Sequence, residues 1–479
     1  FDFFDKMESF DEEKLVNKFS HLKANTLANH KSLLYKTLLT SLRLLRNEDP
    51  AIAIKDLISS ANVLHNKGLY RQSLSQLQKA KNLSIKNGMD ILRLEVVEFE
   101  KKIETRYVTG SEPNRANDLT AESETLRHNF YYQGSWSDLS LRLYDYYLKY
   151  GLVRNKEDFE QVSSFFEKNK PNQETALGSD IIYYYQSYVW FYHITQNFTA
   201  CYRYAKKWCI LFEDSPILLQ NEPEMYIRGF HNVLSSLFFC DDLKRFEIEF
   251  EKLERYLLET QDDFNENQRI QAFTYLETAR LNLFSMRGHF SEGSDYCNHF
   301  LDRLESYVNR MDTHRVLVFR YKIASIYFGG GNYHQALKQL NEINNHPTST
   351  LKEDIQVYAR FLTVIAHFEL GDDDLLFFQI KSTYRFMLKM KDFQQIHSAI
   401  FRFLRKSIYM DRSTLIPYFK ELRTELLKIV EDRYEKRPML YLDIISWLDS
   451  KLEKKSVEEI IRRKKFNEGS QSSLELLPS

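Results

Sequence analysis

The chain has 479 residues, of which 43% are hydrophobic, 14 are glycine and 9 are proline. Sheet-rich proteins and βαβ enzymes need many glycines and prolines for their turns, so the scarcity of both argues against these classes and favours long helices joined by short loops. The 66 basic and 67 acidic residues give a formal net charge of -1, which lacks the basic excess that is typical of nucleic-acid binders.

Residues 1–50 are predicted to form an N-terminal helical region. The stretch Lys31–Arg46 reads KSLLYKTLLTSLRLLR and predicts a strongly amphipathic helix without a repeat turn. The acidic start and the lack of an apolar segment argue against a signal peptide, and Phe1 in place of Met leaves room for a missing upstream part. The longest segment without Lys, Arg, Asp or Glu, Ile181–Tyr202, contains several polar residues, so we expect no membrane span and a cytoplasmic protein.

A repeated pattern begins at Gly68 and is clearest at Gly331. Seven positions before each glycine stands an alanine, two positions after it a tyrosine, and five positions after it a small residue. Residues four apart share one face of a helix, so the small residues allow two antiparallel helices to approach closely while the tyrosine fills the turn. Each glycine is expected to end the first helix in the left-handed conformation.

Weaker copies of this pattern have their origins at Gly134, Gln196, Asp241, Gly288 and Gly371, and the frame at Gly371 slips after the turn. The pattern resembles the tetratricopeptide repeat (TPR), a helix–turn–helix unit of about 34 residues. The chain as a whole resembles uncharacterised bacterial TPR proteins and, more loosely, the Rap-type peptide receptors. This resemblance implies an all-α fold, in which an N-terminal helical region precedes TPR-like helical hairpins stacked in a right-handed superhelix of about seven pairs.

The predicted domain organisation follows from these repeats and from the composition between them. After the N-terminal region at 1–50 we expect a first TPR-like unit at 51–107, a polar linker at 108–120, a degenerate TPR-like superhelix at 121–450, a charged C-terminal helix at 451–466 and a disordered tail at 467–479. Capping-box patterns at Thr350 with Glu353 and at Ser456 with Glu459 predict two helix starts.

The sequence shows no pattern of a catalytic, cofactor or metal site. The glycine run at 329–331 is not followed by the GK[ST] of a phosphate loop, and HExxH and CxxC are both absent. We expect the four cysteines to be reduced core residues; they are Cys201, Cys209, Cys240 and Cys297. The prediction is therefore a protein that is not an enzyme and that holds neither a cofactor nor a metal.

The candidate binding residues come from the resemblance. In TPR proteins the residues 3, 6 and 10 positions before the turn origin line the inner, concave face. In this chain those positions are polar or histidine-bearing in the N-terminal half and become Phe328, Phe361 and Phe368 towards the C-terminus. The candidate groove residues are Asn62, His65, Glu124, His128, Tyr131, Gln186, Trp190, His193, His231, Ser235, Thr278 and Asn282.

Two functions and one plain alternative stay open from the sequence. The first is a non-catalytic scaffold or adaptor that binds a protein or peptide partner in the concave groove through side-chain hydrogen bonds and aromatic contacts. The second is a regulatory protein, either a signal-peptide receptor or a DNA-associated transcription regulator, whose N-terminal helical region carries the output. The plain alternative is that the groove is an ordinary solvated surface and the basic run at 462–465 an ordinary helix end. Nucleic acid and membranes are not expected partners.

Overall fold

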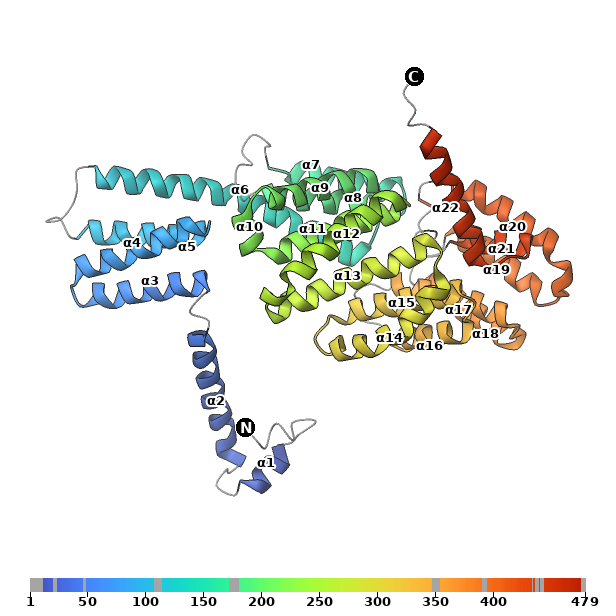
Figure 1. The fold of residues 1–479 in the computed structure, drawn as a ribbon, viewed down its shortest axis with the longest axis horizontal. Helices are drawn as coiled ribbons and strands as arrows, with labels where there is room; N and C mark the ends of the chain where they lie inside the picture. The colour runs from blue at the N-terminus through green and yellow to red at the C-terminus, as the bar shows by residue number, and fades with distance from the viewer. Residues whose placement is uncertain are drawn as a thin grey trace. The chain divides into compact units, whose positions relative to one another are not determined.

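The computed structural model describes residues 12–19, 24–45, 49–106, 114–171, 181–346, 354–389, 394–432, 434–435, 439 and 443–474. Within these ranges the chain forms helices and no strand (Figure 1), which confirms the predicted all-α class. The chain divides into two compact units, Phe1–Phe130 and Tyr131–Ser479. We refer to them as unit 1 and unit 2 and describe each by itself.

Unit 1 packs its helices around a small aliphatic core. Its elements are α1 (Glu12–Lys18), α2 (Ala24–Leu45), α3 (Pro50–Asn66), α4 (Tyr70–Lys86), α5 (Asp90–Glu104) and the first part of α6 (Arg115–Tyr150). Helix α3 begins at Pro50 because the Asp49 side chain accepts hydrogen bonds from the backbone N–H groups of Ala51 and Ile52, and because proline suits the first helical position. The core between α3, α4 and α5 consists of Ile54, Ile58, Ala61, Leu77, Ala80, Val96 and Ile103.

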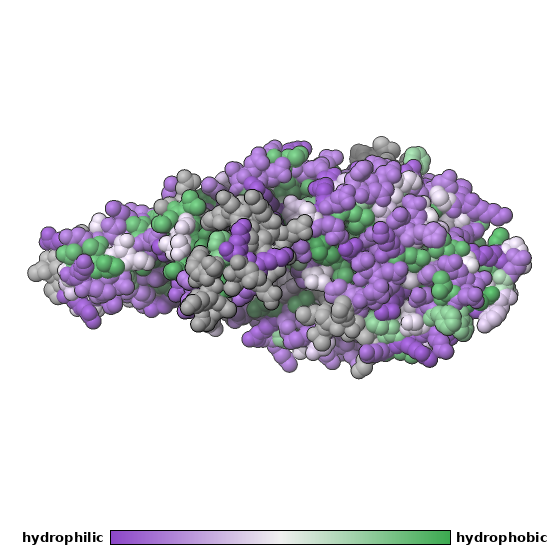
Figure 2. All heavy atoms as spheres, turned by 90° about the horizontal axis from the view of Figure 1, so that it is seen from below, coloured by the Kyte–Doolittle hydropathy of each residue, from purple (hydrophilic) through white to green (hydrophobic). Residues whose placement is uncertain are grey.

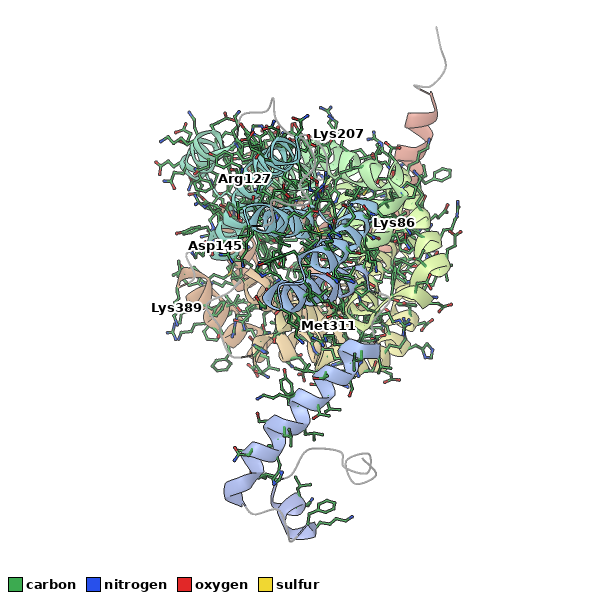
Figure 3. All side chains as sticks on the ribbon, turned by 90° about the vertical axis from the view of Figure 1, so that its left-hand side faces the viewer. Lys86, Arg127, Asp145, Lys207, Met311 and Lys389 are labelled. Atoms are coloured by element: carbon green, nitrogen blue, oxygen red, sulfur yellow. The ribbon has the colours of Figure 1, made fainter. Side chains whose placement is uncertain are left out.

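Helix α2 leaves much of its apolar face open to solvent. Leu34, Leu38 and Leu42 follow one another at the spacing of one helix face, and they are 48%, 40% and 56% exposed. Figure 3 draws the side chains of α2 as sticks on its blue ribbon. The amphipathic helix that was predicted at Lys31–Arg46 therefore forms within α2. Its leucine face is left uncovered by the part of unit 1 that the structure describes.

Unit 2 contains the later helices, which pack in two large hydrophobic clusters and one smaller cluster. In chain order after α6 they are α7 (Lys156–Asn169), α8 (Ile181–Ile194), α9 (Phe198–Glu213), α10 (Pro216–Asn221), α11 (Pro223–Phe239), α12 (Leu243–Thr260), α13 (Glu266–Arg287), α14 (Phe290–Val308), α15 (Thr313–Gly329), α16 (Tyr333–Asn344), α17 (Asp354–Leu370), α18 (Asp373–Lys389), α19 (Gln395–Ser407), α20 (Ile416–Ile429), α21 (Ile444–Glu453) and α22 (Val457–Leu474). One large cluster contains Trp208 and Phe246, and the other contains Phe319 and Trp447. In the view of Figure 2, polar residues cover most of the visible surface and apolar side chains emerge in small patches.

Six of the seven predicted turn origins adopt the left-handed backbone conformation between two packed helices. Their φ angles are 75° at Gly68, 58° at Gln196, 57° at Asp241, 66° at Gly288, 77° at Gly331 and 80° at Gly371. The corresponding hairpins are α3–α4, α8–α9, α11–α12, α13–α14, α15–α16 and α17–α18. The predicted turns at these six positions are confirmed, including those where glutamine or aspartate replaces glycine.

The close approach of the two helices in a hairpin also follows the predicted frame. In the first hairpin the hydroxyl of Ser73 donates a hydrogen bond to the carbonyl oxygen of Ala61 at 2.8 Å, and in the α8–α9 hairpin the Cys201 thiol lies 3.6 Å from the carbonyl oxygen of Val189. The predicted slip after Gly371 is wrong. The residues 5, 9 and 12 positions after it, Leu376, Ile380 and Thr383, are all buried, so the frame continues through α18.

The predicted turn at Gly134 is wrong, because α6 runs as one helix from Arg115 to Tyr150. A single glycine inside a helix costs only about 1 kcal/mol relative to alanine, and an added Cβ at Gly134 would meet nothing within 4 Å. The position therefore neither demands glycine nor stops the helix. Residues 115–120, which we expected to belong to a linker, form the start of this same helix.

The last helix extends further than the sequence predicted. Helix α22 continues to Leu474, so residues 467–474 of the predicted tail are helical, and residues 475–479 lie outside the described part of the chain. The capping box at its start is confirmed, because the backbone N–H of Ser456 donates to the Glu459 carboxylate and the backbone N–H of Glu459 donates to the Ser456 hydroxyl, both at 3.1 Å. The other predicted capping box, at Thr350 and Glu353, lies outside the described residues.

Helix α22 contacts the turns of two earlier hairpins. The Arg462 guanidinium donates to the carbonyl oxygen of Gly288 at 3.2 Å, and Lys465 forms an ion pair with Asp241 at 2.5 Å. Glu458 accepts hydrogen bonds from the backbone N–H and the hydroxyl of Ser291 at 2.9 and 2.8 Å. The basic run at 462–465 is thus held by acids and backbone groups of unit 2 rather than forming a free solvated helix end.

The three glycines at 329–331 serve the packing and the turn of one hairpin, as an inter-helix turn predicts. Gly331 supplies the left-handed backbone. A Cβ at Gly329 would stand 2.5 Å from the ring of Phe290, and one at Gly330 would stand 3.0 Å from the hydroxyl of Ser294. Two of the glycines therefore exist because α14 lies against the end of α15.

We expect the substitution Gly329→Ala to lower the free energy of unfolding of unit 2 by about 1–3 kcal/mol, the usual cost of overpacking a tight site. The cause is the collision of the new methyl group with the Phe290 ring. Gly134→Ala is the matched control, because it lies in an open helical position and is expected to stabilise by about 0.5–1 kcal/mol. Urea denaturation followed by tryptophan fluorescence measures both, and the same change for the two variants would contradict this account.

Candidate binding site

The predicted groove residues are divided between the two units. Those up to His128 belong to unit 1 and those from Tyr131 onward belong to unit 2. His65 needs correction, since it is 8% exposed and its ring packs edge-on against the rings of Tyr70 and Phe99 at centroid distances of 5.6 and 5.5 Å. It is a core histidine between α3, α4 and α5, because α5 covers the face that we expected to be open.

Glu124, His128 and Tyr131 also need correction. All three are exposed along α6, and Tyr131 is 71% exposed. Because α6 has no turn at Gly134, the hairpin whose inner face they were expected to line does not form. Asn62 is exposed on α3.

The three predicted residues of α8 belong to an aromatic cluster. Gln186 is buried. Trp190 packs against Tyr147 with a ring distance of 5.4 Å, and the His193 ring contacts the rings of Tyr147 and Phe239 at 5.1 and 6.0 Å. Trp190 and His193 therefore hold α6, α8 and α11 together in addition to any contact with a ligand.

The apolar half of the predicted groove is hydrophobic core. Phe328, Phe361 and Phe368 are 2%, 2% and 5% exposed. Their rings pack against other aromatic side chains of unit 2, as Phe361 does against Phe401. These three positions are thus not available to a ligand.

The other four predicted residues lie on α11 and α13, and two of them, His231 and Asn282, lie beside cations. His231 and Ser235 come from α11 and Thr278 and Asn282 from α13, and the neighbouring helix α15 packs against α13. The charged residues at this place are not among the predicted groove residues. We define the cationic face as Arg228, His231, Tyr275, Asn282, Arg315 and Lys322.

The centre of the cationic face is a stack of rings under a guanidinium group. The His231 and Tyr275 rings are stacked at 4.2 Å with an interplanar angle of 11°. The Arg315 guanidinium lies 5.0 Å from the centroid of the Tyr275 ring, and its Nη2 donates to the Tyr275 hydroxyl at 3.1 Å. The Tyr275 phenol thus holds Arg315 without neutralising its charge.

The electrostatic potential at this face is positive. Burial, together with the positive charges of Arg315 and Lys322, lowers the pKa of His231 to about 3, so the imidazole is neutral at pH 7. Burial on its own would raise the pKa of Tyr275, but the charges of Arg315 and Arg228 hold that pKa below its ordinary value. Both shifts have the direction that nearby cations produce.

Lys322 is the most strongly perturbed cation of the face. Its ammonium donates to Oδ1 of Asn282 at 2.5 Å and lies 5.1 Å from the centroid of the Phe238 ring. Burial lowers its pKa to about 8. A lysine in such a place bears a cost that a negatively charged neighbour would remove.

In the described ranges, Arg228, Arg315 and Lys322 form no ion pair with an aspartate or glutamate. Other cations of the same helices are neutralised: Arg280 of α13 pairs with Glu254 at 2.8 Å, and Arg320 of α15 pairs with Glu305 at 2.9 Å. The arrangement is suited to hold an anionic group.

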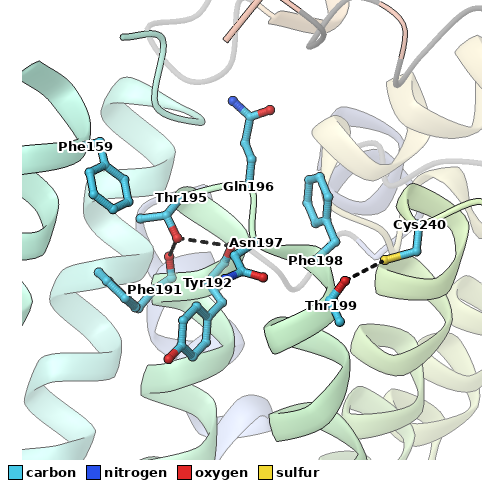
Figure 4. A pocket seen from close by; sticks show the side chains of 9 residues that line it. All are labelled: Phe159, Phe191, Tyr192, Thr195, Gln196, Asn197, Phe198, Thr199 and Cys240. Atoms are coloured by element: carbon cyan, nitrogen blue, oxygen red, sulfur yellow. Dashed lines mark hydrogen bonds between the residues drawn. The ribbon is translucent and has the colours of Figure 1, made fainter. Parts of the chain in front are cut away.

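An open cavity of about 440 Å³ lies elsewhere, at the turn between α8 and α9. Figure 4 shows Phe159 and Phe198 on its two sides and Gln196 between them. Its lining residues are Phe159, Phe191, Tyr192, Thr195, Gln196, Asn197, Phe198, Thr199 and Cys240. None of these side chains carries a charge that would activate the exposed Cys240 thiol, which lies 3.9 Å from the Thr199 hydroxyl.

The cysteine prediction holds for three of four positions. Cys201, Cys209 and Cys297 are buried and Cys240 is exposed, and all four are free thiols. Burial raises the pKa of the Cys201 thiol to about 12, so it stays protonated at neutral pH. The prediction of a core position is wrong for Cys240, because this residue ends α11 at a turn rather than facing the core.

Two further features are absent from the described ranges, a metal-binding cluster and a membrane-spanning helix. No three histidine, cysteine, aspartate or glutamate side chains there are grouped so as to hold a metal ion. Among the helices of those ranges, none combines the length and the apolar character that a membrane-spanning segment needs.

Charged side chains elsewhere on unit 2, such as Lys207 and Lys389, lie on its outside (Figure 3). The fold and the site together define an all-helical protein of paired helices with a cationic surface on α11, α13 and α15. No protein-family model matches the chain, and neither a curated protein nor a solved structure matches it.

Proposed function

We propose that the chain is a non-catalytic scaffold or adaptor of the TPR type, which holds an extended segment of a partner protein or peptide against the cationic face. The observation that carries this proposal is the set of three cations on α11 and α15 that form no ion pair with an acidic residue of the described part of the chain. Uncompensated charge at a partly buried place is costly to folding. Its presence is accounted for when a ligand supplies the opposite charge.

The hairpin geometry supports the TPR part of the proposal. Six left-handed turns follow the repeat frame, and α11, α13, α15 and α17, the first helices of successive hairpins, pack in sequence against one another. In a stacked array of this kind the first helices form a continuous surface along which an extended segment can lie. Ser235 and Thr278 are partly exposed on that surface.

A peptide-display selection tests the proposal. A random library is selected on the wild-type protein, and the enriched peptides are measured against Ser235→Trp, which places a bulky side chain on the cationic face. We expect these peptides to lose at least about tenfold in affinity, or about 1.4 kcal/mol, because the indole occupies their position whatever their charge.

Glu251→Ala is the matched control, since Glu251 is exposed on α12 and away from the cationic residues. Circular dichroism confirms that both variants are folded. A library that enriches no peptide, or peptides that bind Ser235→Trp as tightly as the wild type, would remove the proposed function.

A further inference from the structure

The two cations of α15 have a fixed spacing. Arg315 and Lys322 are seven residues apart, so they lie on one side of the helix and about 10 Å apart along its axis. Both act on the same imidazole, because each contributes to the lowered pKa of His231. The face therefore offers two positive points rather than one diffuse charge.

Both cations have hydrogen-bond donors beside them that a ligand can use. Arg315 uses Nη2 for the Tyr275 hydroxyl, and a guanidinium carries five N–H donors in a planar fork that suits a carboxylate. At the other point Asn282 accepts from Lys322 through Oδ1, which leaves its Nδ2 group as a donor beside the ammonium. Arg228 adds positive charge on the Arg315 side.

We propose that the cationic face recognises an acidic peptide segment with two carboxylates three residues apart, one bound by Arg315 and the other by Lys322 with Asn282. In a polyproline II conformation, residues i and i+3 point to the same side at a separation of about 9 Å, which matches the spacing of the two cations. The rings of Tyr275 and Phe238 lie against these two cations and hold them in place. This inference rests on the proposed function and names its ligand class.

A peptide fits the face better than a nucleic acid does. A single strand carries a phosphate at every nucleotide and is bound along a continuous basic track. Here the next cations on α13 and α15, Arg280 and Arg320, are already paired with glutamates, so the positive region ends within about two helix turns.

The test uses a fluorescein-labelled decapeptide with blocked ends, glutamate at positions 4 and 7, and alanine and proline elsewhere. Fluorescence anisotropy gives its dissociation constant for the wild type at low salt. We expect glutamine at either position to weaken binding about tenfold or more, as the loss of a charge-assisted hydrogen bond does. Moving the second glutamate to position 5 is expected to weaken binding as well, because the two carboxylates then point to different sides.

Substitutions in the protein test the same contacts from the other side. Arg315→Gln and Lys322→Met are each expected to weaken binding of the decapeptide about tenfold. Arg320→Gln on the same helix is expected to leave it unchanged, because Arg320 is engaged by Glu305 and Gln339. Lys322→Arg keeps the charge and is expected to keep most of the affinity.

Three outcomes overturn the inference. They are equal binding of the glutamate and glutamine decapeptides, equal binding by Lys322→Met and the wild type, and tighter binding of a ten-nucleotide single-stranded DNA that depends on the same cations. If library-selected neutral peptides bind and are blocked by Ser235→Trp, only the acidic ligand class is lost and the proposed function stands. If no peptide binds the wild type, both are lost.

Discussion

Glu100→Ala is expected to lower the free energy of unfolding of unit 1 by about 3 kcal/mol. Glu100 is 1% exposed on α5, where its carboxylate pairs with Lys81 of α4 at 2.6 Å and with Arg115 of α6 at 3.0 Å. Removing one partner of a buried ion pair leaves the other charge uncompensated, which costs about 3–5 kcal/mol. We expect the lower end of this energy range, because Glu122 still contacts Lys81 at 2.9 Å and compensates part of its charge.

The measurement must report on unit 1 alone. All four tryptophans lie in unit 2, so tryptophan fluorescence does not follow this loss. Hydrogen exchange of the backbone amides of α4 and α5 reports on unit 1. We expect their exchange through local unfolding to become about 100-fold faster, because each 1.4 kcal/mol of lost stability raises the rate tenfold. Glu95→Ala, at an exposed position of the same helix, is the control, and equal exchange in the two variants would show that the buried pair contributes nothing.

The same charges explain how α6 is held in unit 1. Glu122 of α6 contacts both Lys81 and Arg93, the latter at 2.7 Å. Burial by itself would raise the pKa of Glu122, but hydrogen bonds from Lys81 and Arg93 lower it below its ordinary value. These partners are 41 and 29 residues away in sequence, so no local pattern indicated that α6 would pack against α4 and α5.

Turns could be predicted from the sequence where several local requirements coincide. At Gly331, Gly68 and even Asp241 the small, apolar and turn-filling positions on both sides agree with one hairpin, and the backbone adopts the predicted left-handed conformation. Gly134 and the tryptophan two positions after it match the same pattern, although no turn forms there. Nothing packs against Gly134, and the continuous helix keeps every backbone hydrogen bond that a turn would break.

The candidate site could be predicted only in part. Its cationic side chains stand at positions of the repeat other than 3, 6 and 10 before the turn origin, which were the positions used for the prediction. His231, Ser235, Thr278 and Asn282 were found through positions 6 and 10 before the origin. Lys322 stands nine positions before Gly331, and Arg228 and Tyr275 stand 13 positions before their origins at Asp241 and Gly288. These positions lie next to the predicted ones on the same helix faces. The signal that marks the cations among them, the lack of an ion pair with an acid in the described ranges, exists only in three dimensions.

The last prediction is that Lys322→Met makes the protein more stable while it weakens ligand binding. At pH 7 Lys322 is charged in both the folded and the unfolded state, and only the folded state bears the cost of burying that charge. A pKa lowered from 10.5 to about 8 corresponds to a stabilisation by the methionine of about 1–3 kcal/mol at pH 7. Most substitutions of partly buried residues destabilise, so an increase is diagnostic of a residue that is retained for function.

The pH dependence separates this cause from a general effect of hydrophobic substitution. Between pH 8 and pH 10.5 the unfolded lysine binds a proton that the folded lysine has lost, so the stability of the wild type rises with pH in this window relative to Lys322→Met. Above pH 10.5 the lysine is neutral in both states and the advantage of the variant disappears. Urea denaturation at pH 7, 9 and 10.5 measures this convergence, with Lys338→Met at an exposed position of α16 as the control. If Lys322→Met is less stable than the wild type at pH 7, or if the difference does not change with pH, then Lys322 does not bear an uncompensated charge, and the strongest reason for an anionic ligand at this face is gone.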